Sequence, residues 1–79
     1  MMREKEFRVI ITFATTTDAM AMESYCTSHG VPGRLIPVPS AISAGCGMCW
    51  SAPSAQRECV TRAIGDAELC CEGVYEMLI

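Results

Sequence analysis

The amino-acid sequence predicts an α+β fold in which two helices cover one face of a four-stranded antiparallel sheet. Three observations support this prediction. Apolar residues recur over Phe7–Phe13 with the period of two that is typical of a β-strand. Two later segments carry apolar residues at helical spacing, and short β-rich runs lie between and after them. The resulting order (βαββαβ) is typical of a ferredoxin-like split β-α-β sandwich.

The first strand and the first helix follow from local patterns. Ile10 lies between the alternating apolar residues Val9 and Ile11 and is itself apolar, so both faces of the strand carry apolar side chains. We therefore expect the strand Phe7–Phe13 to be central and covered on both faces. Thr15–Asp18 supply N-cap candidates and an acidic residue for the first helical turn. The predicted helix of about twelve residues ends at Gly30, a C-cap candidate, with Pro32 beyond it.

The second half of the chain repeats the pattern with shorter strands. Arg34–Val38 is predicted to be a strand, and Pro37 favours an edge position because it cannot donate to a ladder. A glycine-bearing loop leads to a strand over Met48–Ala52, and a second helix is predicted to begin at Pro53. A strand over Gly73–Ile79 closes the chain. The predicted apolar stripe of the second helix consists of Cys59, Val60, Ala63, Ile64 and Ala67.

Length and composition limit the classes of protein. The 79 residues predict one domain spanning 1–79, with a core so small that a homodimer stays open as a way to bury more apolar surface. A net charge of −3 with only six Lys and Arg residues argues against nucleic acid. The longest apolar run, Phe7–Ala14, is too short for a bilayer, so no membrane partner is expected. The start MMREKEFRVIITFA lacks the features of a secretion signal, and we expect a cytoplasmic protein.

The six cysteines are therefore expected to be reduced thiols rather than a disulfide framework. Cys26 and Cys59 fall on the apolar sides of the two helices and are predicted to be buried small hydrophobes. Cys70 and Cys71 follow the second helix, whose end returns to the same end of the sheet as Cys46. Capping and packing is the favoured interpretation of this pair, and a resolving thiol or a metal ligand is the alternative.

Topology singles out Cys46 as the candidate reactive thiol. The loop between the second and third strands lies at the end of the sheet where the first strand finishes and the first helix begins. Cys46 is therefore expected near Thr16 and Thr17, where the helix dipole favours a thiolate and a pKa below the roughly 8.5 of a free cysteine. Gly45 and Gly47 tolerate positive φ and leave Cys46 open to another protein's thiol.

The other chemistries have weaker support. Cys49 completes a C-x-x-C pair with Cys46, but it enters a strand rather than a helix, so its role as a resolving thiol is an open alternative. His29 is the only histidine and falls at the far end of the first helix, which argues against a Cys–His pair. A zinc ion bound by four cysteine thiolates needs a second cysteine pair whose two members are separated by a few residues. Cys70 and Cys71 are adjacent and therefore form a poor second pair. We expect no metal and no other cofactor.

A family resemblance rests on three segments of the chain, VIITFATTTDAMAMESYC, HGVPGRLIPVPSAISAGCGM and EGVYEM. Together they resemble the putative selenium/sulfur carrier protein-like family, and the block from RLIP-x-P to CG is the most specific part. The resemblance implies a cytoplasmic thiol carrier or accessory protein whose acceptor thiol is Cys46 and whose partners are sulfur or selenium donor and acceptor proteins. Whether it is an enzyme stays open, and a non-enzymatic carrier is favoured. Two departures are the missing basic residue near Ser40 or Ala41 and the additional Cys49.

Three hypotheses follow for the function. The leading one is a carrier that accepts a persulfide or selenium on Cys46 and passes it on. The alternative is a small thiol-redox or metal-binding module that uses Cys46 and Cys49. The third is a non-catalytic interaction module that dimerises through a sheet edge, which is favoured if no cysteine has raised reactivity at neutral pH.

Overall fold

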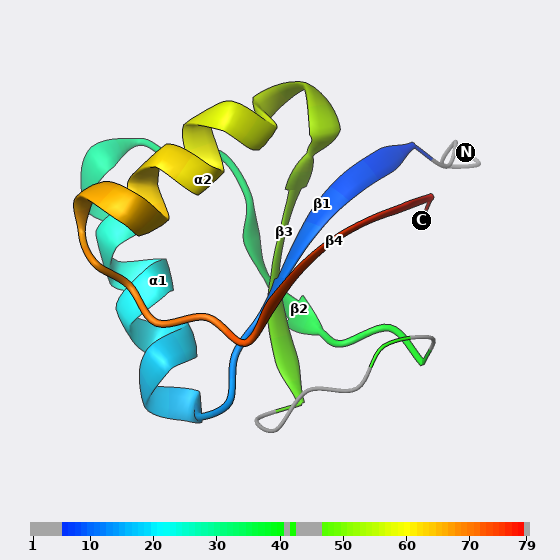
Figure 1. The fold of residues 1–79 in the computed structure, drawn as a ribbon, viewed down its shortest axis with the longest axis horizontal. Helices are drawn as coiled ribbons and strands as arrows, with labels where there is room; N and C mark the ends of the chain where they lie inside the picture. Colours follow the sequence, from blue (N-terminus) through cyan, green and yellow to red (C-terminus); the bar gives the residue numbers. More distant parts are fainter. Residues whose placement is uncertain (1–5, 41, 43–46, 79) are drawn as a thin grey trace.

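The computed structural model describes residues 6–40, 42 and 47–78, and Cys46, Gly45 and Ala41 lie outside them. The described elements are β1 (Phe7–Thr12), α1 (Thr16–His29), β2 (Arg34–Pro37), β3 (Met48–Pro53), a 3₁₀ turn η1 (Ser54–Gln56), α2 (Arg57–Asp66) and β4 (Gly73–Leu78) (Figure 1).

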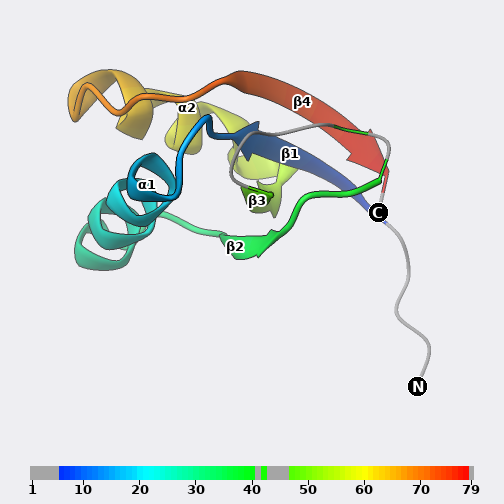
Figure 2. The ribbon, with the colours of Figure 1, turned by 90° about the horizontal axis from the view of Figure 1, so that it is seen from below.

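Two helices pack on a four-stranded antiparallel sheet, which confirms the predicted α+β class. The sheet order is β2-β3-β1-β4, and every neighbouring pair is antiparallel (Figure 2). Because β3 is antiparallel to both β1 and β2, these two strands run parallel with β3 between them. The order is compatible with the ferredoxin-like plan, and Pro37 lies in the edge strand β2, as expected.

The central strand β1 is buried on both faces. Val9 and Ile11 belong to the core cluster with residues of α1, β3 and α2, so they face the helices. Ile10 and Thr12 alternate with them and therefore face the other side of the sheet. All four are fully buried, as the apolar Ile10 predicted.

The ends of α1 follow the capping residues of the sequence. The Thr15 hydroxyl accepts a hydrogen bond from the Asp18 N–H (3.2 Å), and Gly30 ends the helix in the left-handed conformation (φ 68°). Between them, Ala19, Met22 and Cys26 are the buried residues of α1. The predicted helix and both of its caps are confirmed.

We expect Thr15→Ala to lower the free energy of unfolding by about 1 kcal/mol, because one N–H of the first turn loses its acceptor. Urea unfolding followed by the fluorescence of Trp50, the only tryptophan, measures the change. Thr17→Ala is the matched control, since Thr17 is exposed in the same turn. Equal losses for the two variants would contradict the capping role of Thr15.

The second helix differs from its prediction at Cys59, which is exposed rather than buried. The chain passes from β3 through η1 before α2 begins, and the residues of α2 that are buried are Val60 and Ala63. Cys59 lies one residue before Val60, which is about 100° around the helix axis. The core-facing stripe is therefore narrower than predicted and excludes Cys59.

Candidate functional site

Three connections meet the sheet at the same end. One row of register partners crosses the sheet from β2 through β3 and β1 to β4. It consists of Ile36, Cys49, Thr12 and Gly73. At this row β1 and β2 end, while β3 and β4 begin. The β2–β3 loop, the start of α1 and the segment that enters β4 are consequently attached to one end of the sheet, as topology predicted.

The β2–β3 loop is closed at its base by backbone contacts. The Val38 N–H donates to the Gly47 carbonyl (3.0 Å), directly beyond the register pair Pro37 and Met48. Gly47 is exposed and has a φ of 75°, a left-handed conformation that glycine tolerates. The loop that carries the candidate thiol Cys46 is thus anchored beside the end of β1.

The start of α1 belongs to the same end of the sheet. Only three residues separate Thr12, the last residue of β1, from Thr16, the first of α1. Thr16 and Thr17 are exposed in the first turn. The unpaired N–H groups of this turn carry a partial positive charge, which favours an anion such as a thiolate nearby.

Cys49 is fully buried in β3. It lies between Thr12 of β1 and Ile36 of β2, on the face of the sheet away from the helices. A thiol in this position contributes to packing, and its use as a resolving thiol requires movement of β3. That use stays a prediction.

Cys26 is the buried thiol of α1, as predicted. Its side chain is fully buried in the core cluster. Loss of solvation on burial, with a smaller contribution from the Cys59 thiolate, raises the pKa of Cys26 to about 11. Cys26 therefore stays protonated at neutral pH and is unsuited to nucleophilic attack.

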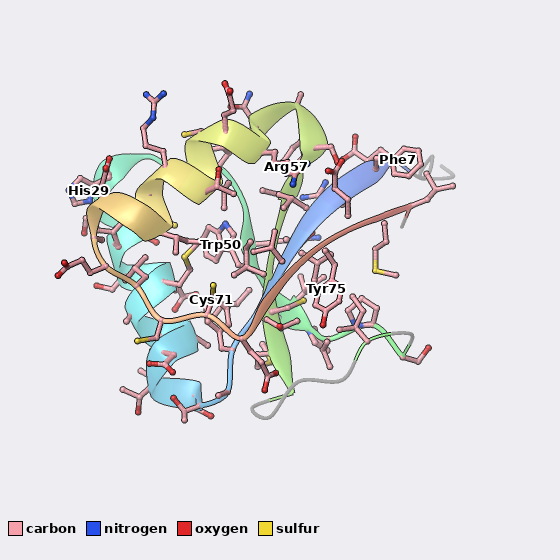
Figure 3. The ribbon with its side chains drawn as sticks, viewed as in Figure 1. Phe7, His29, Trp50, Arg57, Cys71 and Tyr75 are labelled. Carbon is pink, nitrogen blue, oxygen red and sulfur yellow. The ribbon has the colours of Figure 1, made fainter. Side chains whose placement is uncertain are left out.

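Cys70 and Cys71 are exposed, so the packing interpretation favoured from the sequence is wrong for them. The next residue, Glu72, donates its N–H to the Thr12 carbonyl (2.7 Å), which fixes the segment beside the end of β1. Although the residue is exposed, partial loss of solvation at its thiol and, to a smaller extent, the neighbouring Cys70 thiolate raise the pKa of Cys71. Figure 3 shows Cys71 on the irregular segment between α2 and β4. Two accessible thiols thus share the end of the sheet with the β2–β3 loop.

His29 is the last residue of α1, far from the start of that helix. Its Nδ1 lies 2.9 Å from the Tyr25 carbonyl oxygen, and its ring stacks on Tyr25 with centroids 4.0 Å apart. In the described part of the chain, no group of three or more His, Cys, Asp or Glu side chains could hold a metal ion. Residues 6–40, 42 and 47–78 also form no helix with the length and apolar character of a membrane span.

The fold and the cysteine positions define a small α+β thiol protein. The chain belongs to the family described as "Putative Se/S carrier protein-like", which matches residues 8–76. Neither a curated protein nor a solved structure matches the chain. The matched range begins at the second residue of β1 and ends at Glu76 of β4, so it includes both helices, β2, β3 and the β2–β3 loop.

Proposed function

We propose that the protein is a cytoplasmic carrier that accepts sulfur or selenium on Cys46 and passes it to an acceptor protein. The observation that carries this proposal is the family match over residues 8–76, which spans the loop of Cys46. Two described features support it. The loop is closed at Val38 and Gly47, and its base lies at the end of the sheet where α1 begins.

The transfer needs only a thiolate and a donor persulfide. The Cys46 thiolate attacks the outer sulfur of the donor persulfide, and the sulfur–sulfur bond of the donor breaks. The donor cysteine leaves as a thiolate, and Cys46 holds the new persulfide. Selenium follows the same course when the outer atom is selenium. Because one sulfur–sulfur bond forms as another breaks, no external oxidant or reductant is required.

A thiol-redox module is the second candidate, favoured by the exposed pair Cys70 and Cys71 at the same end of the sheet. In this alternative, one thiolate of the pair attacks the inner sulfur of a Cys46 persulfide. The sulfur–sulfur bond of the persulfide breaks, hydrosulfide leaves, and a disulfide to Cys46 forms. Cys49 could take this role only after β3 opens, since it is fully buried.

Incubation of the reduced protein with a persulfide donor, followed by peptide mass spectrometry, tests the proposal. We expect one additional sulfur atom on the peptide that contains Cys46. Cys46→Ser should lose all loading, because serine cannot form a persulfide. Cys59→Ser is the matched control, since it removes an exposed thiol of α2 and should load like the unchanged protein.

The remaining cysteine variants separate the candidates. Loading that persists in Cys46→Ser and moves to Cys70 or Cys71 would contradict the assignment of Cys46 as acceptor. Normal loading of Cys46 with slower release in Cys70→Ser or Cys71→Ser would support a resolving pair. Equal reactivity of all exposed thiols, with no stable loading, would favour the non-catalytic interaction module.

A further inference from the structure

The two edges of the sheet differ in their protection. The edge strand β2 has four residues and contains Arg34 and Pro37, a charge and a residue without an N–H, which both discourage pairing with another chain. The opposite edge strand β4 has six residues and contains no Lys, Arg or Pro. Within the described residues, β1 is its only strand partner. In the described part of the chain, β4 therefore presents a row of backbone donors and acceptors that pairs with no second strand, and Glu76 is the one charged residue in it.

Apolar side chains are exposed along this same edge. The described residues include five large apolar side chains that are exposed, and four of them lie on β1 or β4. These four are Phe7 (61% exposed), Val74 (43%), Tyr75 (44%) and Leu78 (50%). Phe7 and Leu78 are register partners. Figure 3 shows Phe7 and Tyr75 at the β1–β4 side of the sheet. Exposed apolar side chains on both faces of an edge strand indicate an interaction surface.

The apolar side chains of β4 are arranged symmetrically about Glu76. Val74 and Leu78, two residues to either side, share the face of Val9 and Ile11 that is turned toward the helices. Tyr75 and Met77, one residue to either side, lie on the opposite face. An isologous interface needs such a self-complementary strand, because each residue then meets its counterpart from the other half.

We propose that β4 pairs antiparallel with β4 of a second copy of this chain, about a two-fold axis at Glu76. Val74 then lies opposite Leu78 of the second copy on the helix side. Tyr75 lies opposite Met77 of the second copy on the other side. Both pairs are apolar, and the two sheets join into one continuous sheet.

The charge at the axis is compensated within each copy. Two carboxylates directly opposite each other in a sheet repel. Glu76 is paired with Arg57 of α2 (Nη1 to Oε1, 2.9 Å), so each copy brings its own cation to the axis. The charges then lie in the order Arg57, Glu76, Glu76, Arg57 across the axis, so the repulsion between the two carboxylates is reduced and does not prevent pairing of two copies. The dimer does not depend on the carrier function, and it forms whether or not Cys46 accepts sulfur.

Sedimentation equilibrium in reducing buffer tests the proposal, since the reductant removes any disulfide-linked dimer. We expect a dimer whose dissociation constant rises roughly tenfold or more in Val74→Lys/Leu78→Lys, because charged side chains disrupt edge pairing. Met20→Lys is the matched control, because Met20 is a 60% exposed apolar residue on α1. This variant should dimerise like the unchanged protein.

Hydrogen exchange locates the interface. The amides of Val74–Leu78 should gain protection as the protein concentration rises, while those of β2 should not change. Far-UV circular dichroism of the double variant establishes that it is folded. A protein that stays monomeric at high concentration, a dimer unaffected by the double variant, or concentration-dependent protection at β2 instead would each overturn the proposal.

Discussion

Replacing Gly33 with alanine is expected to lower the free energy of unfolding by about 3–5 kcal/mol. Gly33 has a φ of 122°, a conformation that L side chains rarely adopt. A β-carbon at this position would lie 2.7 Å from the Ser51 carbonyl oxygen and 2.8 Å from Cε2 of Trp50. The loss of unfolding free energy therefore has two contributions, one from the strained backbone conformation and one from the steric collision.

The collision at Gly33 also affects a buried hydrogen bond. The Trp50 indole donates from Nε1 to the Pro32 carbonyl (3.1 Å) and is only 3% exposed. To admit a methyl group, the indole has to move away from Gly33, or the backbone of residues 32–33 has to shift. Either movement weakens this bond and opens the core where β2 follows α1.

Two other glycines serve as matched controls in the same urea-unfolding measurement. Gly30 has a φ of 68°, but a β-carbon added there would meet no other atom within 4 Å, so Gly30→Ala should cost about 1 kcal/mol for the backbone alone. Gly65 lies in α2 with open space and no positive φ, so Gly65→Ala should stabilise by about 0.5 kcal/mol. If Gly33→Ala cost no more than Gly30→Ala, the close approach to Trp50 would be disproved.

The contrast between these glycines shows what the sequence could predict. Gly30 follows a helical pattern that ends before Pro32, so its capping role is a local signal. The need for glycine at position 33 depends on Trp50, a contact between residues far apart in the sequence. Nothing within VPGRL indicates that an indole packs against its backbone.

The same distinction applies to the candidate site. That the base of the β2–β3 loop and the start of α1 lie at the same end of the sheet was predictable, because strand order and direction determine which ends of the strands meet. The burial of Cys26 was predictable too, from its place in the helical stripe, but the exposure of Cys59, Cys70 and Cys71 was not. Cys59 lies at the border of the apolar stripe of α2. Cys71 lies in a segment whose path is fixed by the hydrogen bond from the Glu72 N–H to the Thr12 carbonyl, and no local sequence pattern indicates this hydrogen bond.

Cys26 is expected to react with an alkylating reagent at neutral pH at least about a hundredfold more slowly than the exposed Cys59 or Cys70. The pKa of Cys26 is raised from 9.0 to about 11, mainly by burial, and each pKa unit lowers the thiolate fraction about tenfold. Its full burial adds the need for a local opening before the reagent can enter. Mass spectrometry of the labelled peptides over time gives the separate rates.

The control for this experiment is the same labelling in denaturant, where all cysteines should react at similar rates. Cys59→Ser tests the smaller cause of the shift, because removing that thiolate should lower the pKa of Cys26 slightly and leave it slow to react. Rapid labelling of Cys26 in the folded protein would show that α1 does not hold it in the core.

The raised pKa of Cys26 also predicts how stability changes with pH. The folded state keeps its proton above pH 9.0, where the unfolded thiol already ionises, so the free energy of unfolding should fall as pH rises toward about 11. A shift of this size corresponds to about 2–3 kcal/mol. Cys26→Ala lacks the titrating group. It should start about 1–2 kcal/mol less stable at neutral pH because of the smaller side chain. The difference between the two proteins should then shrink or reverse over this alkaline range, and a constant difference would contradict a buried, protonated Cys26.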